Sequence, residues 1–185
     1  MESEQGLNTS AAISGSASLP VGGPALTHIY QVDCIRPDGS LRWSETVKNL
    51  VPDAGLDEIL SRSWKASALT VADHVGLMDG TPTVAAGDTM AAHAGWVEVT
   101  DYDEATREAL TLGAVSGQSV DNSASKASYA INATVTIGGA FICDNNTKGG
   151  ATGTLLGAAA FTAGDRAAQA GDTLNLTITL TAASA

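Results

Sequence analysis

An alternation of apolar and polar positions runs through much of this chain and predicts β-strands. Between residues 127 and 137, apolar side chains occupy the odd positions and mostly polar side chains the even positions. Thr173–Thr181 repeats the pattern, with leucine or isoleucine at every even position. Because successive side chains of a strand point to opposite faces, each segment predicts a strand with one face on a core.

A β-hairpin is predicted near the beginning of the chain. His28–Ile35 and Leu41–Val47 both alternate, and the turn sequence Pro-Asp-Gly at positions 37–39 lies between them. Proline fixes its own φ angle, aspartate can hydrogen-bond to nearby backbone, and glycine accepts a positive φ. The two alternating segments are therefore expected to pair.

Shorter segments complete the predicted strands. They are rich in Val, Leu, Ala or aromatic residues and span Trp96–Tyr102, Ala109–Val115, Ala140–Cys143 and Leu155–Phe161. Gly138-Gly139 is expected to form a bend or bulge before the third of them. The turn-rich segment Asp144–Gly153 is expected to form a hairpin loop before the fourth.

One helix is predicted directly after Pro52. Asp53 is the expected N-cap, because its side chain can accept hydrogen bonds from the first free N–H groups of a helix. The apolar residues of the segment recur at helical spacing and are Leu56, Ile59, Leu60 and Trp64. This face is expected to pack over one end of a sheet.

Together these elements predict an all-β fold. Short strands, one short helix and Gly-rich turns favour a β-sandwich, with a jelly roll as one candidate connectivity. The chain is expected to consist of an extended N-terminal arm at residues 1–27 and a β-sandwich domain at residues 28–185. The arm has only Glu2 and Glu4 as charged residues and few large apolar ones. Such a segment is expected to become ordered only along a partner or a neighbouring copy.

The charge balance limits the partners that the chain is expected to bind. Nine Lys and Arg against twenty Asp and Glu give a formal net charge of −11, and no basic cluster occurs. Because such a chain repels phosphate backbones, no direct contact with nucleic acid is expected.

Cysteine usage and hydropathy give further expectations. Cys34 and Cys143 match apolar positions of predicted strands and belong to no Cys-x-x-Cys pattern, so two buried thiols are expected in place of a disulfide. The N-terminus has neither the basic nor the apolar region of a signal peptide. No apolar run approaches the length of about 18 residues that a membrane span needs. We therefore expect synthesis in the cytoplasm and no membrane contact.

The stretch from His74 to Trp96 contains the residues that most resemble a reactive site. Its histidines and aspartates could form a metal site, and these residues are His74, Asp79, Asp88 and His93. Their spacing fits no short metal-binding motif, however, so a loop that connects strands is the favoured interpretation. Val75, Leu77 and Trp96 are expected to anchor that loop.

Three other kinds of chemistry find weak support. No Gly-x-Ser-x-Gly elbow precedes a helix, so a serine nucleophile is not indicated. Asp101, Asp103 and Glu104 could serve glycoside hydrolysis, but neighbouring carboxylates on a connector are typical of a solvated loop. Lys148-Gly149-Gly150 lacks the order and the following helix of a phosphate-binding loop. No catalytic, cofactor-binding or metal-binding residue is therefore predicted.

Four long stretches, in this order, resemble virion structural proteins of tailed bacteriophages. They are KNLVPDAGLDEIL (Lys48–Leu60), VGLMDGTPTVAAGDTMAAHAGWVEVTDYDEATR (Val75–Arg107), SVDNSASKASYAINATVTIGGAFI (Ser119–Ile142) and NTKGGATGTLLGAAAF (Asn146–Phe161). The resemblance covers about residues 28–183 and leaves the predicted arm unmatched.

The resemblance implies a non-enzymatic capsid decoration, or cement, protein. Its expected partners are the major capsid protein and other copies of itself, and its expected location is the capsid surface of the virion, after synthesis in the host bacterial cytoplasm. A tail or fibre component is one alternative. A host-surface carbohydrate-binding module is another, and it would require exposed aromatic side chains. Trp43, Trp64 and Trp96 are available for this, but Trp43 and Trp64 are expected on core faces.

Overall fold

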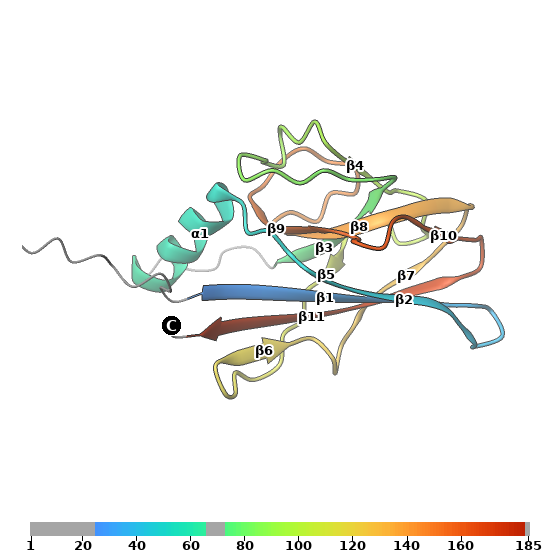
Figure 1. Ribbon diagram of the computed structural model, residues 1–185, viewed down its shortest axis with the longest axis horizontal. Helices are drawn as coiled ribbons and strands as arrows, with labels where there is room; N and C mark the ends of the chain where they lie inside the picture. The colour runs from blue at the N-terminus through green and yellow to red at the C-terminus, as the bar shows by residue number, and fades with distance from the viewer. Residues whose placement is uncertain (1–24, 66–72, 184–185) are drawn as a thin grey trace, which may run out of the picture.

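The computed structural model describes residues 25–65 and 73–183, which form two antiparallel β-sheets and a helix (Figure 1). The elements are β1 (Ala25–Ile35), β2 (Leu41–Lys48), α1 (Asp53–Trp64), β3 (His74–Asp79), β4 (Val97–Glu98), β5 (Glu108–Ala109), β6 (Ser119–Asp121), β7 (Ala127–Ala130), β8 (Val135–Cys143), β9 (Leu155–Ala160), β10 (Arg166–Ala168) and β11 (Thr173–Ala183). The predicted all-β sandwich with a short helix is confirmed. Because β1 begins at Ala25, the predicted boundary after residue 27 falls inside a strand, and residues 1–24 of the predicted arm lie outside the described residues.

The first sheet, called sheet A here, is built on the pairing of β1 with β11. Its strand order is β2-β1-β11-β6, and β7 also pairs with β11. The β1–β11 ladder runs without a shift from Ala25 opposite Ala183 to Ile35 opposite Thr173. β1 and β2 form the predicted hairpin, so the alternation and the Pro-Asp-Gly turn located this part of the sheet correctly.

The second sheet, called sheet B here, is centred on β8 and β3. Its order is β10-β8-β3-β4, with β9 also paired to β8 and β5 to β3. Met78 pairs with Gly139 and Asp79 pairs with Ile137, so Gly138 is the extra residue of a β-bulge. The predicted bulge is therefore present, although β8 continues through it.

The core lies between the two sheets, and isolated β-bridges connect chain segments across each of its two sides. Leu50 bridges to Ala158 of β9 on one side, and Tyr102 bridges to Ile131 on the other. Cys34 and Cys143 are both buried as free thiols, as predicted. The bridges give the sandwich the character of a flattened, partly closed barrel.

The alternating segment at residues 127–137 is two strands and not one. β7 belongs to sheet A, β8 belongs to sheet B, and Ile131–Thr134 crosses between them. Tyr129, Ile131 and Ile137 nevertheless all face the core. The alternation persists because the chain turns the corner while it keeps one side on the same core.

Two other predicted strands are much shorter in the structure. The prediction for Trp96–Tyr102 is reduced to β4, and the prediction for Ala109–Val115 is reduced to β5, which begins at Glu108. Their backbones leave the ladder and make single hydrogen bonds to neighbours instead, such as Val99 N–H to the carbonyl oxygen of Leu77.

Helix α1 lies where the sequence predicts a helix, but three of its four apolar residues face away from the core. Pro52 is its N-cap residue, and no side chain caps it, so the predicted cap by Asp53 is wrong. Gly55 is buried against β9, where an added Cβ would lie 2.9 Å from the carbonyl oxygen of Leu156. The residues predicted to face the core are largely exposed: Leu56, Leu60 and, at 84%, Trp64. The close approach of the two backbones at Gly55 determines how the helix packs on β9. The apolar stripe of the helix, formed by Leu56, Leu60 and Trp64, therefore faces outward.

Replacing Gly138 with alanine should destabilise the fold. The new Cβ would collide with the carbonyl oxygen of Gly80, and overpacking of this kind costs about 1–3 kcal/mol or more because backbone cannot rotate aside. Urea denaturation followed by circular dichroism measures the effect. Gly87→Ala is the matched control, because its Cβ meets no atom within 4 Å. Equal midpoints for the two variants would contradict the bulge geometry.

Candidate functional site

The stretch from His74 to Trp96 is organised around the indole ring of Trp96. The ring of His93 stacks on it, with centroids 3.7 Å apart and an interplanar angle of 16°. The indole Nε1–H donates to Asp88 Oδ2 at 3.1 Å, and Asp88 also accepts from the N–H of Ala85 at 3.0 Å. Trp96 is buried, as are Val75 and Leu77, so the predicted anchors are confirmed. Two of the four residues considered as metal ligands therefore position a tryptophan.

The other two residues considered as metal ligands lie apart. His74 and Asp79 are the first and last residues of β3, so the length of the strand separates them. The carboxylate of Asp79 accepts the N–H of Gly80 at 2.6 Å in the following turn. Within residues 25–65 and 73–183, no group of three or more His, Cys, Asp or Glu side chains is close enough to hold a metal ion.

The acidic connector at residues 101–104 ties loops together. Both carboxylate oxygens of Glu104 accept the N–H of Ala130, at 3.1 and 3.2 Å. Asp103 Oδ1 accepts the side-chain amide of Asn132, whose own N–H donates to the carbonyl of Asp101. The carboxylates thus fix the end of β7 and do not face one another across a cleft, as glycoside hydrolysis would need.

The Lys148-Gly149-Gly150 segment lies in the β8–β9 hairpin loop, as predicted. Lys148 Nζ donates to the carbonyl oxygen of Tyr102 at 2.9 Å and lies 4.2 Å from the centre of its ring. The N–H of Gly149 donates to Glu98 Oε2 at 3.0 Å. The groups that could cradle a phosphate are therefore occupied by contacts within the protein.

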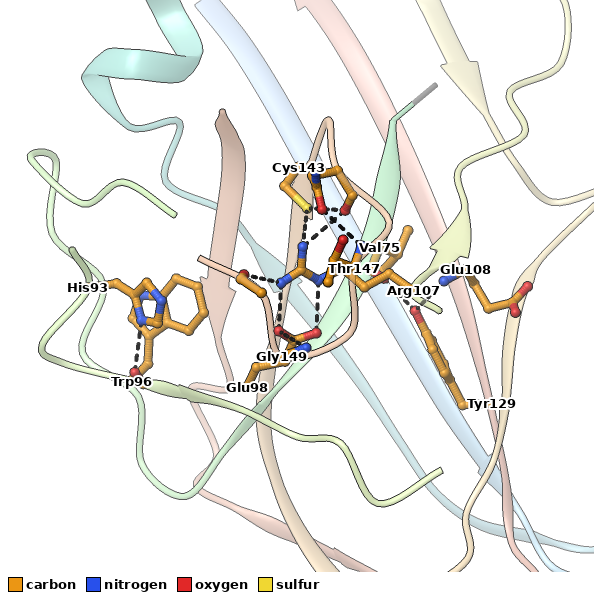
Figure 2. A network of polar contacts seen from close by, with 12 residues as sticks. Val75, His93, Trp96, Glu98, Arg107, Glu108, Tyr129, Cys143, Thr147 and Gly149 are labelled. Carbon is orange, nitrogen blue, oxygen red and sulfur yellow. Dashed lines mark hydrogen bonds and ion pairs between the residues drawn. The ribbon is translucent and has the colours of Figure 1, made fainter. Parts of the chain in front are cut away.

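The centre of this region is a buried arginine that the sequence did not single out. Only 1% of Arg107 is exposed, and all five of its N–H groups have acceptors (Figure 2). Nε donates to Glu98 Oε1 at 2.8 Å, and Nη2 donates to Glu98 Oε2 at 2.6 Å and to the carbonyl of Gly150 at 2.7 Å. Nη1 donates to the carbonyl of Asn145 at 3.0 Å and to Cys143 Sγ at 3.3 Å.

The contacts of Arg107 make it a structural cation. Burial is the largest single effect and lowers the pKa of its guanidinium, but the hydrogen bonds to Glu98 and the surrounding negative charge together outweigh burial, so the net direction of the pKa is upward. The charge is therefore permanent and fully satisfied, with Phe141 beneath it at 5.2 Å. Nothing in the connector sequence around Arg107 distinguishes it from a solvated charge, which explains why sequence reasoning missed it.

The third histidine, His28, belongs to a buried polar cluster that also escaped the sequence analysis. Its Nδ1 lies 2.8 Å from the side-chain nitrogen of Asn49, which is 3.5 Å from the hydroxyl of Tyr30. Burial lowers the pKa of His28 to about 4. The ring lines a pocket of about 80 Å³ together with Arg62 and Asp73, which pair with each other at 2.9 Å.

A second pocket lies beside the Trp96 stack. It has a volume of about 190 Å³ and is lined by His93, Trp96, Val97, Glu98, Gly149, Gly150 and Ala151. Both carboxylate oxygens of Glu98 are already held by Arg107 and Gly149. The carboxylate on the pocket wall is thus engaged in contacts within the protein, and the exposed side chain of Val97 forms the apolar edge of the pocket.

Comparison with known proteins gives no relative from which residue roles could be transferred. No protein-family model, no curated protein and no solved structure matches the chain. Across the part of the chain that the structure describes, no helix is both long and apolar enough to cross a membrane.

Removing the guanidinium of Arg107 should destabilise the protein strongly. Arg107→Met leaves the Glu98 carboxylate buried without its partner, which costs about 3–5 kcal/mol. Lys126→Met is the matched control, because Lys126 and Asp33 form a more exposed pair at 3.7 Å, and such pairs contribute less than about 1 kcal/mol. Chemical denaturation measures both variants. Similar small losses in the two would show that the buried pair does not hold this region together.

Acid should weaken the fold through His28. Its pKa in the folded protein, about 4, is below the ordinary value of 6.5, so the folded state favours the neutral ring. This contribution is complete above pH 6.5 and decreases by about 3 kcal/mol as the pH falls to 4. His28→Gln should remove that part of the pH dependence of the unfolding free energy. An unchanged slope in His28→Gln would refute the assignment.

Proposed function

We propose that this chain is a non-enzymatic structural protein of a tailed-bacteriophage virion. In this role it binds the outer surface of the major capsid protein shell and stabilises the shell as a cement protein. Two observations support the proposal. The four stretches that resemble such virion proteins include α1 up to Leu60 and strands β4, β6, β7 and β9, with most of β3 and β8. The His, Asp and Arg side chains within them position a tryptophan, a bulged turn and a loop.

The observation that carries the proposal is the outward apolar stripe of α1, formed by Leu56, Leu60 and Trp64. These residues are spaced four apart, so they lie in a row along one side of the helix. Trp64 is 84% exposed, and the other two are about half exposed. A row of this kind gains free energy when a partner covers it, at about 25 cal/mol per Å² of apolar surface. The stripe is therefore the proposed contact with the shell.

The charge distribution is compatible with an apolar contact of this kind. Five of the nine cationic side chains, at positions 42, 62, 107, 126 and 166, form ion pairs with carboxylates. Many acidic groups of the described residues consequently form no ion pair, and a chain with a net charge of −11 repels DNA. The proposed partners are the major capsid protein and further copies in the assembled lattice, without direct contact to nucleic acid or membrane.

A small contact can stabilise a shell because it is repeated. Three side chains cover less area than the roughly 1,200–2,000 Å² of a stable pairwise interface. In a symmetric lattice, however, each bound domain that touches two subunits ties them together, and many such ties add. The proposed function therefore needs many copies of a weak contact.

One alternative gains support from the structure. A carbohydrate-binding module for the host surface requires an exposed aromatic side chain, and Trp64 was expected in the core but is exposed. Trp96 is buried, and Trp43 packs against the core and donates its Nε1–H to the carbonyl of Ala167 at 2.8 Å. A single exposed indole is less than the platform that sugar rings use, so the cement role is preferred. A tail or fibre component remains the other alternative.

The number of copies per virion tests the proposal directly. A cement protein should be present at on the order of hundreds of copies, because each symmetry-related site of the shell binds one. Quantitative mass spectrometry of purified virions, with the major capsid protein as internal standard, gives this number. About six copies, or a few tens, would place the protein in the tail.

Substitutions on α1 separate the proposed contact from its alternatives. Leu60→Ser/Trp64→Ser should weaken binding to stripped shells by at least about tenfold, since each buried side chain of this size contributes about 1.5–3 kcal/mol. Val97→Ser is the matched control, because Val97 is 68% exposed but lies in sheet B. Loss of glycan binding with unchanged shell binding would favour the carbohydrate-binding alternative.

Removal of residues 1–24 should also weaken shell attachment without cutting β1.

A further inference from the structure

The inner face of sheet A extends beyond its cover at one end of the molecule. Along β1 the inward side chains become progressively exposed, from 0% at Tyr30 through 6% at His28 to 42% at Leu26. On β11, Ile178 is fully buried, whereas Ala182, which pairs with Leu26, is exposed. β1 and β11 run past sheet B at this end, beneath α1 (Figure 1). An apolar sheet face of this kind needs another layer.

Two adjacent pockets follow this uncovered face and are together called the overhang groove here. The outer pocket, about 170 Å³, is lined by Leu26, Val115, Val120, Ala182 and their neighbours. The inner pocket, about 80 Å³, lies beneath Ile59 of α1. His28 and Leu180 line both pockets, so the two are adjacent.

We propose that the overhang groove binds the N-terminal segment of the same chain, residues 1–24, through Leu19-Pro20-Val21. The position of the segment is the first argument. β1 begins at Ala25 and Leu26 lines the groove, so the segment is tethered directly at the edge of the surface. A tether this short gives an effective concentration on the order of millimolar, which exceeds that of a second copy in dilute solution.

The sequence of the segment is the second argument. Gly22-Gly23-Pro24 provides residues that favour a reversal of the chain directly before β1. In the proposed contact, a reversal at these residues lets Leu19-Pro20-Val21 reach Leu26 and Ala182. No charged residue occurs between positions 5 and 24, so none has to be desolvated in the apolar groove.

This inference goes beyond the proposed function, because it concerns the free chain and requires no shell. The contact covers the apolar end of sheet A before assembly. If the same segment also reaches a neighbouring subunit in a shell, the intramolecular contact is exchanged for an intermolecular one. Its test therefore uses the purified chain alone, so failure of the shell-binding proposal cannot be mistaken for failure of this one.

Disulfide trapping in the full-length chain tests the contact. The variant Val21→Cys/Ala182→Cys should form an intrachain disulfide under diamide, seen as a monomer on non-reducing gels and as a linked peptide by mass spectrometry. Ala182 is exposed near the end of β11, so a thiol at this position leaves the core unchanged. The native Cys34 and Cys143 are buried and do not compete.

The matched control is Val21→Cys/Ala183→Cys, because Ala183 is exposed and as close to the start of β1 as Ala182 but, as the next residue of the strand, lies on the opposite face of sheet A. Trapping with Ala182→Cys should be at least about tenfold faster than with the control, as proximity in a bound state requires. Equal rates in the two variants would overturn the proposal. Disulfide-linked dimers as the main product would overturn it as well, and would assign the groove to the segment of a second copy.

Discussion

The Arg107–Glu98 ion pair is the interaction on which the irregular half of the molecule depends. It joins β4, the connector before β5, the end of β8 and the β8–β9 loop, four segments that share little ladder pairing. A buried guanidinium is costly unless every N–H has an acceptor, and here the acceptors beside Glu98 and Cys143 are two backbone carbonyls of the loop, those of Asn145 and Gly150. The loop backbone therefore has to stay where Arg107 needs it. The two predicted strands that are reduced to short pairs, β4 and β5, lie beside this ion pair: Glu98 belongs to β4, and Arg107 directly precedes β5.

The regular half of the molecule follows from the sequence because it depends on local rules. The hairpin of β1 and β2, strand β9 and strand β11 were all predictable, since period-two alternation and turn residues specify a strand without knowledge of its neighbours. The same rule could not show that residues 127–137 change sheets at Ile131–Thr134, because a corner that keeps one side on the core leaves the alternation intact. Helical spacing likewise located α1 but not its orientation. Gly55 offers no side chain to a pattern of apolar residues, yet it permits the close approach that turns Leu60 and Trp64 outward.

The roles of polar and charged side chains are harder to predict from the sequence than the strands, for a related reason. The sequence showed which residues could bind a metal or transfer a proton, but not which hydrogen bonds already occupied them. Asp88 and His93 are near each other, as their spacing permits, yet both contact Trp96. Arg107 and His28 drew no attention because a lone arginine in an acidic connector and a histidine at a strand end are typical of solvated positions. Their importance comes from partners more than twenty residues away, among them Asn145 and Asn49.

The two apolar surfaces that stay open have different physical origins, and this argues for different roles. The stripe on α1 is exposed because a glycine contact rotates the helix, so any cover must come from another molecule or from a segment that crosses the helix. The overhang groove is exposed because β1 and β11 are longer than the strands opposite them, and the chain that could extend the second layer begins at the end of the same strand. An apolar sheet face that extends beyond the layer covering it needs a further segment of chain packed against it. We therefore assign the groove to a contact within one chain and the stripe to a contact with other molecules.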